Sequence, residues 1–262
     1  MKANFHTHTK RCGHAKGEDR DYVEAALAAG MHTLGFSDHA AYSFPNGYVS
    51  TWRVQPDMVE EYVSSIRALG AEYSDRIRLL VGFEMEYFPE LFDTAFEAVK
   101  RYGMDYLVLT QHSYGNEYDI RNPDGSPSHS FHLTDREEKA VAYVDQLIAG
   151  MQTGVFSCVA HPDGFHFNGD EAVYYREMKR LCQAAKRHDL PLEINLLGLG
   201  DHRHYPQERF LKIAAEVGNT MILGCDAHWP EALTDTATQE QGKALATKYG
   251  LKLTEEIRFP LK

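Results

Sequence analysis

Short runs of β-branched and aromatic residues alternate along the chain with longer stretches in which apolar residues recur at helical spacing. This alternation predicts successive βα units, whose parallel strands are covered by helices. We expect strands at 4–8, 33–37, 78–84, 106–110, 156–160, 192–196 and 221–224. We expect helices at about 20–29, 56–69, 91–102, 134–151, 171–188, 206–217 and 236–249.

The number of units limits the choice of fold. About seven βα units in 262 residues predict an α/β barrel of the (β/α)8 type with one unit fewer, and an open doubly wound sheet is the alternative. Neither a linker nor a repeat interrupts the pattern, so residues 1–262 are expected to form a single domain. The segment 115–131 is rich in Asn, Pro, Gly and Ser, and we expect a long loop there after the fourth strand.

Composition excludes several classes of protein. With 43% hydrophobic and 25% charged residues, the chain reads as a soluble globular protein. The net charge of −11 argues against long nucleic acid or an anionic membrane as a partner, because both are polyanions. Four widely separated cysteines form no C-x-x-C pair, and the N-terminus has no apolar signal segment. A cytoplasmic location is therefore expected.

The chain has 14 histidines, and many of them stand where a predicted strand ends. A single H-x-H pair is most often buried and hydrogen-bonded, and a single Asp after a strand is most often a helix cap. Here the same placement recurs in all seven units, whose strand ends meet at one mouth in a parallel barrel. The residues concerned are His6 and His8, Asp38 and His39, Glu84 and Glu86, Gln111 and His112, His161 and Asp163, Glu193 and Asn195, and Asp226 and His228.

These residue types suit divalent metal ions. Residues two apart on a strand project to the same side, so His6 and His8 are expected to point together. Imidazole binds zinc, iron and manganese well, and carboxylates bridge pairs of such ions. The donors are too many for one ion, so two or three ions are expected. Such sites activate water for displacement at phosphorus, which predicts a metal-dependent hydrolase acting on a small phosphorylated substrate.

Six motifs follow one another along the chain: HTHTKRCGHAKG, GFSDHA, GFEMEYF, TQHS, VAHPD and ILGCDAHWP. In this order they resemble the motifs of the PHP (polymerase and histidinol phosphatase) superfamily, and within it the monofunctional histidinol-phosphate phosphatases. The resemblance covers nearly the whole chain and implies the PHP fold, a distorted seven-stranded barrel. The TQHSY segment departs from the Ser-Val-His-Phe type of sequence that many of these phosphatases have, and the loop that follows matches no substrate motif.

The resemblance implies nine ligands for three ions of zinc, iron or manganese. One ion would be held by His6, His8 and Asp226, a second by His112 and His161, with Glu84 bridging the two, and a third by His14, His39 and His228. Glu84, His112, His161 and Asp226 would hold the hydroxide that attacks phosphorus, while no general acid is assigned.

A cationic side chain is also expected to contact the phosphate. Arg203, in the loop after the sixth strand, is the first candidate because its planar fork suits two oxygen contacts. Lys10 and Arg11 follow directly after the H-x-H pair, and Asn195 can hydrogen-bond water or phosphate. Weaker candidates for phosphate contact are Arg53 and Arg121.

The resemblance implies hydrolysis of L-histidinol phosphate to L-histidinol and phosphate, a step of histidine biosynthesis. A phosphatase or phosphodiesterase of the same superfamily that acts on another small ester, on nucleotides or on phosphotyrosine is the alternative. A metal-binding structural or regulatory domain without activity is the non-enzyme alternative. It predicts missing ligands, whereas all nine positions are filled.

Overall fold

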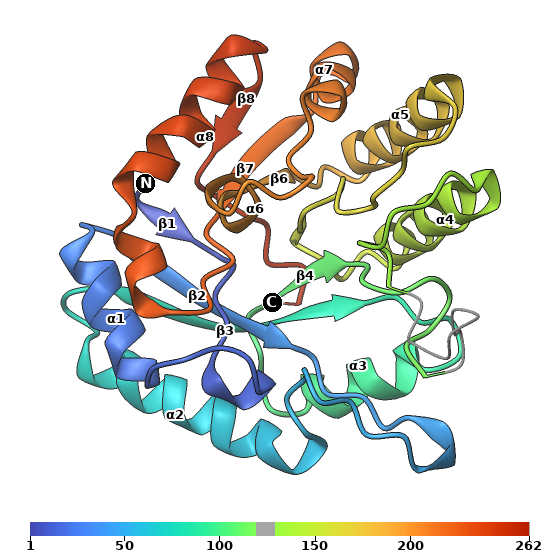
Figure 1. The fold of residues 1–262 in the computed structure, drawn as a ribbon. Coiled ribbons are helices and arrows are strands. Elements are labelled where there is room, and N and C mark those ends of the chain that lie inside the picture. Colours follow the sequence, from blue (N-terminus) through green and yellow to red (C-terminus); the bar gives the residue numbers. More distant parts are fainter. Residues whose placement is uncertain (119–128, 262) are drawn as a thin grey trace.

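The computed structural model describes residues 1–118 and 129–261. Eight parallel strands form one sheet in the order of the chain, and the helices lie on the outer side of the curled sheet (Figure 1). The strands are β1 (Ala3–Asn4), β2 (Thr33–His39), β3 (Arg78–Glu86), β4 (Tyr106–Thr110), β5 (Cys158–Val159), β6 (Leu192–Asn195), β7 (Thr220–Gly224) and β8 (Lys252–Thr254).

Helices connect the successive strands. The α-helices are α1 (Asp19–Ala28), α2 (Val59–Glu72), α3 (Phe92–Lys100), α4 (Glu137–Gln152), α5 (Glu171–Arg187), α6 (Leu196–Gly200), α7 (Glu208–Val217) and α8 (Thr236–Lys248). The 3-10 helices are η1 (Lys10–Cys12), η2 (Pro45–Gly47), η3 (Pro56–Met58) and η4 (Pro230–Thr234). None of the helices in the described part of the chain has the length and apolar character to cross a bilayer.

The prediction of parallel βα units is confirmed, but the prediction of a seven-stranded barrel is wrong. An eighth strand, β8, pairs with β7, and the sheet is an open, curled half-barrel. Within residues 1–118 and 129–261, β1 and β8 form no ladder with each other. The sequence pattern missed β8 because this edge strand is short and only partly buried, so it carries no continuous apolar run.

Several element boundaries also differ from prediction. The strand expected at 4–8 ends at Asn4, and the helix expected from residue 134 begins at Glu137. Thr134 instead pairs with Phe167 in an isolated bridge. The short helix α6 was not predicted, because five residues are too few to show helical periodicity.

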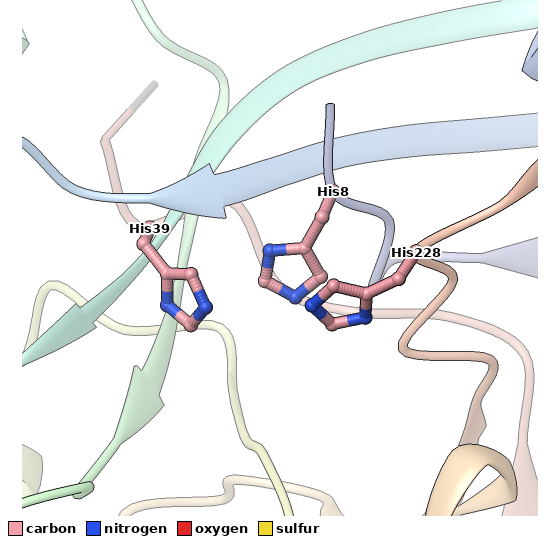
Figure 2. A group of neighbouring side chains, drawn as sticks. All are labelled: His8, His39 and His228. Carbon is pink, nitrogen blue, oxygen red and sulfur yellow. The ribbon is translucent and has the colours of Figure 1, made fainter. Parts of the chain in front are cut away.

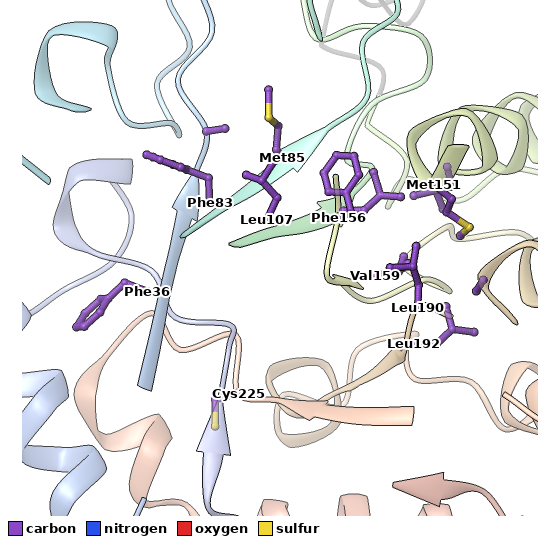
Figure 3. Close-up of a cluster of buried hydrophobic side chains, with 14 of the residues drawn as sticks. Phe36, Phe83, Met85, Leu107, Met151, Phe156, Val159, Leu190, Leu192 and Cys225 are labelled. Carbon is purple, nitrogen blue, oxygen red and sulfur yellow. The ribbon is translucent and has the colours of Figure 1, made fainter. Parts of the chain in front are cut away.

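Alternation along β3 separates the outer core from the inside of the sheet. Phe83 and Met85 point outward into the large cluster that packs between strands and helices (Figure 3). Glu84 lies between them in sequence and therefore points inward, because successive strand residues face opposite sides. Leu80 belongs to a second apolar cluster, which fills the inside of the sheet.

A tyrosine crosses the inside of the curled sheet. The ring of Tyr106 on β4 lies against Gly35 on β2 and Gly82 on β3. A Cβ atom at either position would overlap the ring, so both positions need glycine. The Tyr106 hydroxyl donates to the carbonyl of Phe5 at 2.9 Å. This packed layer fills the interior below the carboxyl ends of the strands, which leaves those ends as the place for a site.

Candidate metal centre

Strand register brings the polar residues together. His39 at the end of β2 pairs with Glu84 on β3, so both lie at the same level of the sheet. The segments that follow β1 and β7 pair through a bridge between Thr7 and Ala227. The residues that flank this bridge, His6 and His8 on one segment and Asp226 and His228 on the other, are thereby placed side by side.

Two strand-end residues, His161 and Asp226, have unusual backbone conformations. The φ angle is +23° at His161 and +48° at Asp226, values that residues other than glycine rarely adopt. Such conformations persist where the surrounding structure holds them, and they concentrate at functional sites. Here they turn the chain directly after β5 and β7 and aim both side chains at the centre of the sheet's mouth.

Eight of the nine expected ligands belong to groups of three residues. Within each group, the three donor atoms lie within 4.8 Å of one another. One group is His8, His39 and His228, shown in Figure 2. The remaining groups that contain only expected ligands are His6, His8 and Asp226; His6, Glu84 and His161; and His39, Glu84 and His112. The ninth, His14, has its Nε2 atom 3.0 Å from Nε2 of His228.

Several donor atoms of this cluster are buried and make no hydrogen bond within residues 1–118 and 129–261. Both oxygens of Glu84, Nε2 of His6, both ring nitrogens of His8 and Nδ1 of His39 make no hydrogen bond. Buried polar groups in folded proteins are almost always satisfied, so each of these atoms needs an explanation. Imidazoles around a central carboxylate form a donor set that fits divalent zinc, iron or manganese. The arrangement therefore fits a multinuclear metal centre.

Carboxylates behind the cluster orient two of the imidazoles. Nδ1 of His6 lies 2.7 Å from Oε1 of Glu193, and Nδ1 of His112 lies 2.7 Å from Oε1 of Glu86. An ionised carboxylate can only accept, so each Nδ1 carries the proton and each Nε2 is free to bind a metal. Both Glu86 and Glu193 belong to the polar residues that the sequence pattern placed at strand ends.

Backbone carbonyls orient two further imidazoles in the same way. Nδ1 of His14 lies 3.0 Å from the carbonyl of Cys12, and Nδ1 of His228 lies 2.9 Å from the carbonyl of Asp226. The Nε2 atoms of His14 and His228 thus face each other across the 3.0 Å gap. Two nitrogens at this separation are well placed to share one ion.

Burial and neighbouring charge act against each other in the cluster. Burial alone would raise the pKa of Glu84, but the imidazoles around it, His39 above all, hold this pKa well below its usual range. Burial alone would lower the pKa of His6, but the carboxylates of Glu193 and Asp226 raise it well above its usual range. Divalent ions in the cluster would supply the positive charge that these carboxylates otherwise draw from protons.

The cluster forms the floor of a cavity of about 570 Å³. Its walls contain aromatic and imidazole side chains that the sequence analysis did not single out. These are Trp52, His129, Phe131, His132, Tyr205 and Trp229. All six stand in loops after strand ends, and that position was the one available signal for them.

Arg203 lines the cavity, as the sequence analysis expected of a phosphate contact. Its guanidinium donates to Asp201 at 2.8 Å and to the hydroxyl of Tyr205 at 3.1 Å, so part of its fork is held in place. Asn195 is buried behind the cluster and donates to Glu193 and, at 3.1 Å, to Asp226. Asn195 therefore supports a candidate ligand and does not line the cavity.

Two other cations expected near the phosphate lie elsewhere. Lys10 pairs with Glu18 on the surface. Arg11 is buried against Asp19 and Glu61, with bidentate contacts of 2.7 and 2.9 Å to Asp19. Neither residue lines the cavity, because Lys10 points toward the start of α1 and Arg11 lies between α1 and α2. The weaker candidate Arg121 lies outside the described residues.

Asp163, one of the polar residues expected at a strand end, is also not on the cavity wall. Its side chain is buried and accepts from the backbone amide of Gln207 at 2.5 Å. Burial raises the pKa of Asp163 to about 7. The contact with Gln207 ties the segment after β5 to the start of α7, which is a structural role.

The chain resembles known proteins over most of its length. The sequence model of the PHP domain matches residues 4–197. The probable histidinol-phosphatase of Deinococcus radiodurans is 27% identical over 235 residues, which cover 86% of this chain and 85% of that protein. The histidinol-phosphatase of Lactococcus lactis subsp. lactis is 25% identical over 238 residues, which cover 87% and 84%.

A solved structure shares the fold. It is the histidinol phosphate phosphatase from Lactococcus lactis subsp. lactis, described as complexed with zinc, L-histidinol and phosphate. The two structures superimpose with a TM-score of 0.75 over 98% of both chains, at 19% sequence identity. At this identity the superposition shows that the arrangement of strands and helices is common to both.

Proposed function

The chain belongs to the PHP domain family, and from this premise we propose that it is a metal-dependent phosphomonoesterase that hydrolyses L-histidinol phosphate. The observation that carries the proposal is the convergence of buried imidazole and carboxylate donors at the floor of one cavity, several of whose donor atoms make no hydrogen bond among the described residues. Relatives named histidinol-phosphatase over nearly the full length support the choice of substrate. So does a structural neighbour that contains zinc, L-histidinol and phosphate.

The cavity favours a small ester over a polymer. Its volume of about 570 Å³ lies within the range of pockets for small molecules. The rings of Trp52 and Phe131 stand in its wall and offer apolar aromatic surface to a planar group such as an imidazole. Arg203 stands in the same wall and offers guanidinium donors to a phosphate.

Different residues of the chain have different roles in the proposed hydrolysis. Two or three divalent ions, when bound, would offset charge on the phosphoryl oxygens and lower the pKa of the attacking water. Glu84 lies at the centre of the donor set, 3.0 Å from ring nitrogens of both His39 and His161, and would hold adjacent ions at a fixed separation. Glu193 keeps the proton of His6 on Nδ1 and so keeps its Nε2 available.

The function is tested by phosphate release from a panel of esters. The protein, loaded with zinc or manganese, is given L-histidinol phosphate, nucleotides, sugar phosphates, phosphotyrosine and a phosphodiester. We expect kcat/KM for L-histidinol phosphate to exceed the others by about 100-fold, which corresponds to roughly 2.7 kcal/mol. A faster ester of another kind would keep the metal hydrolase and reject this substrate. Inactivity of the metal-loaded protein toward every ester would reject the enzyme.

Replacement of Arg203 by alanine should weaken phosphate binding. A hydrogen bond to a charged group contributes about 1.5–3 kcal/mol, so kcat/KM should fall by roughly 10- to 100-fold. The bound metal should be unchanged, because Arg203 contacts none of the candidate ligands through a hydrogen bond. Arg258→Ala is the matched control, since Arg258 is similarly exposed and lies outside the cavity. Equal kcat/KM in the two variants would exclude Arg203 from phosphate contact.

A further inference from the structure

A fully buried arginine stands behind the metal centre. Arg53, in the segment between β2 and α2, is only 1% exposed although its guanidinium is permanently charged. Removing such a charge from water is costly unless the surrounding groups pair with it completely. Arg53 does not line the cavity, so it does not contact phosphate as the sequence analysis had considered. Its burial therefore needs another reason.

Two buried carboxylates from different βα units accept from all three nitrogens of the Arg53 guanidinium. Nη1 and Nη2 donate to the two oxygens of Glu86 at 2.7 and 2.6 Å, and Nε donates to Glu117 at 2.6 Å. Glu86 ends β3, whereas Glu117 follows β4, and both side chains are almost fully buried. The hydroxyl of Tyr48 donates to the other oxygen of Glu117 at 3.1 Å. One guanidinium in the loop after β2 thus joins the end of β3 to the loop after β4.

Arg53 and its two carboxylate partners are connected to the metal centre in two ways. The oxygen of Glu86 that accepts from Nη2 of Arg53 also lies 2.7 Å from Nδ1 of His112. On the other side, the guanidinium of Arg53 stacks over the indole of Trp52 with 4.0 Å to the ring centroid. That indole lies edge to face with His112 at 5.3 Å and with His39 at 4.9 Å between centroids.

We propose that Arg53 is a positioning residue that fixes Glu86, and through it the orientation of His112 toward the metal centre, while it holds Trp52 in the cavity wall. The inference rests on the proposed metal centre and is independent of which ester is hydrolysed. Glu86 has only two oxygens, and a bidentate arginine leaves it a single orientation in which one of them still accepts from His112. Glu117 completes the pairing of the guanidinium and prevents it from turning.

Lysine could not perform this task. An ammonium is a compact donor without a planar fork, so it cannot engage both oxygens of Glu86 and also Glu117 from one position. It also has no flat face to stack on Trp52. Arg53→Lys therefore keeps the charge while it removes the geometry, which makes it the informative substitution.

The matched control is Arg209→Lys. Arg209 also pairs with a carboxylate, Glu171, at 2.6 Å, and stacks on an aromatic ring, Tyr174, at 3.6 Å. None of its partners lines the cavity or belongs to the metal centre. Both variants lose a carboxylate pairing and a stacking contact, but Arg209 is partly exposed, and its partners lie away from the candidate ligands.

The experiment measures metal retention without any ester. Zinc-loaded wild type, Arg53→Lys and Arg209→Lys are dialysed against increasing chelator, and zinc per chain is counted. We expect Arg53→Lys to release an ion at roughly 10- to 100-fold lower chelator than the other two, because partners behind metal ligands typically have effects of this size. The visible absorption of the cobalt-substituted protein should change in Arg53→Lys and stay as in wild type in Arg209→Lys.

A second variant keeps the proposal testable if Arg53→Lys does not fold. Glu86→Gln preserves shape but loses the bidentate pairing, and it should release zinc as Arg53→Lys does. Where both fold, the double variant should be no worse than either single one, because the two residues act on His112 as one unit. Zinc retention and cobalt spectra equal to those of wild type in both variants would overturn the inference. A wild-type chain that retains zinc but hydrolyses no ester would overturn only the proposed function, and one that retains no zinc would overturn both.

Discussion

Removal of the divalent ions is expected to abolish phosphate release and to lower the melting temperature of the protein, and both should return when zinc or manganese is added back. The reason is a set of buried donor atoms, with Glu84 at its centre, that make no hydrogen bond in the part of the chain that the structure describes. Without ions, the buried carboxylates lose the divalent charge that would offset the cost of their desolvation. An ion present at 1,000 times its dissociation constant contributes about 4 kcal/mol to the free energy of unfolding.

In a domain of this size, 1 kcal/mol corresponds to roughly 2 °C or more in melting temperature. The loss of even one ion is therefore expected to lower the melting temperature by about 8 °C or more. Thermal unfolding and phosphate release are measured on the same samples after dialysis against a chelator. The control is the same chelator saturated with zinc before use. A stripped protein that melts as before and still releases phosphate would contradict the metal centre.

Replacement of Glu84 by glutamine is expected to have the largest effect of any single substitution. Glu84 lies within 3.0–3.7 Å of ring nitrogens on five of the candidate ligands, and its two oxygens have no other partner. An amide has one acceptor oxygen and no charge, so it cannot bridge two cations. We expect kcat to fall by about 1,000-fold or more, which corresponds to roughly 4 kcal/mol of lost transition-state stabilisation.

Metal content separates this effect from a loss of folding. The Glu84→Gln protein should bind fewer ions than wild type, while its circular dichroism stays that of the folded chain. Glu177→Gln is the matched control, because Glu177 is equally buried but pairs with Arg176 and Arg180 on α5, outside the metal centre. It should keep full activity and full metal content. A Glu84→Gln protein whose kcat stays within tenfold of wild type would show that Glu84 is not a bridging ligand.

The sequence indicated the fold correctly at the level of repeated βα units. The strand at Tyr106–Thr110 matches its prediction residue for residue, because a short apolar run between polar segments is a local signal. The edge strand β8 and the short helix α6 carry no such signal, so the number of strands was underestimated. Whether a sheet closes depends on how its first and last strands meet, and no local pattern encodes that contact.

Eight of the nine candidate ligands could be placed from the sequence because each lies near the end of a strand or just after it, and the carboxyl ends of parallel strands meet at one edge. His14 and the assignment of ligands to ions came only from the resemblance to the PHP superfamily. The reasoning from strand ends needs only the order of the elements and the alternation of side chains along a strand. The residues expected to contact the substrate could not be identified by this reasoning. Arg203 lines the cavity, whereas Lys10 and Arg11, equally close to a motif in sequence, pair with carboxylates elsewhere.

By itself, then, the sequence determined the parallel βα architecture and the chemistry offered at the strand ends, because both follow from local periodicity. The tertiary structure alone decided which groups stand behind that chemistry. Glu86 meets His112 across 26 residues, and Arg53 meets Glu117 across 64. These contacts depend on how loops pack against one another. The partners of a buried charge such as Arg53 can therefore be identified only in the folded structure.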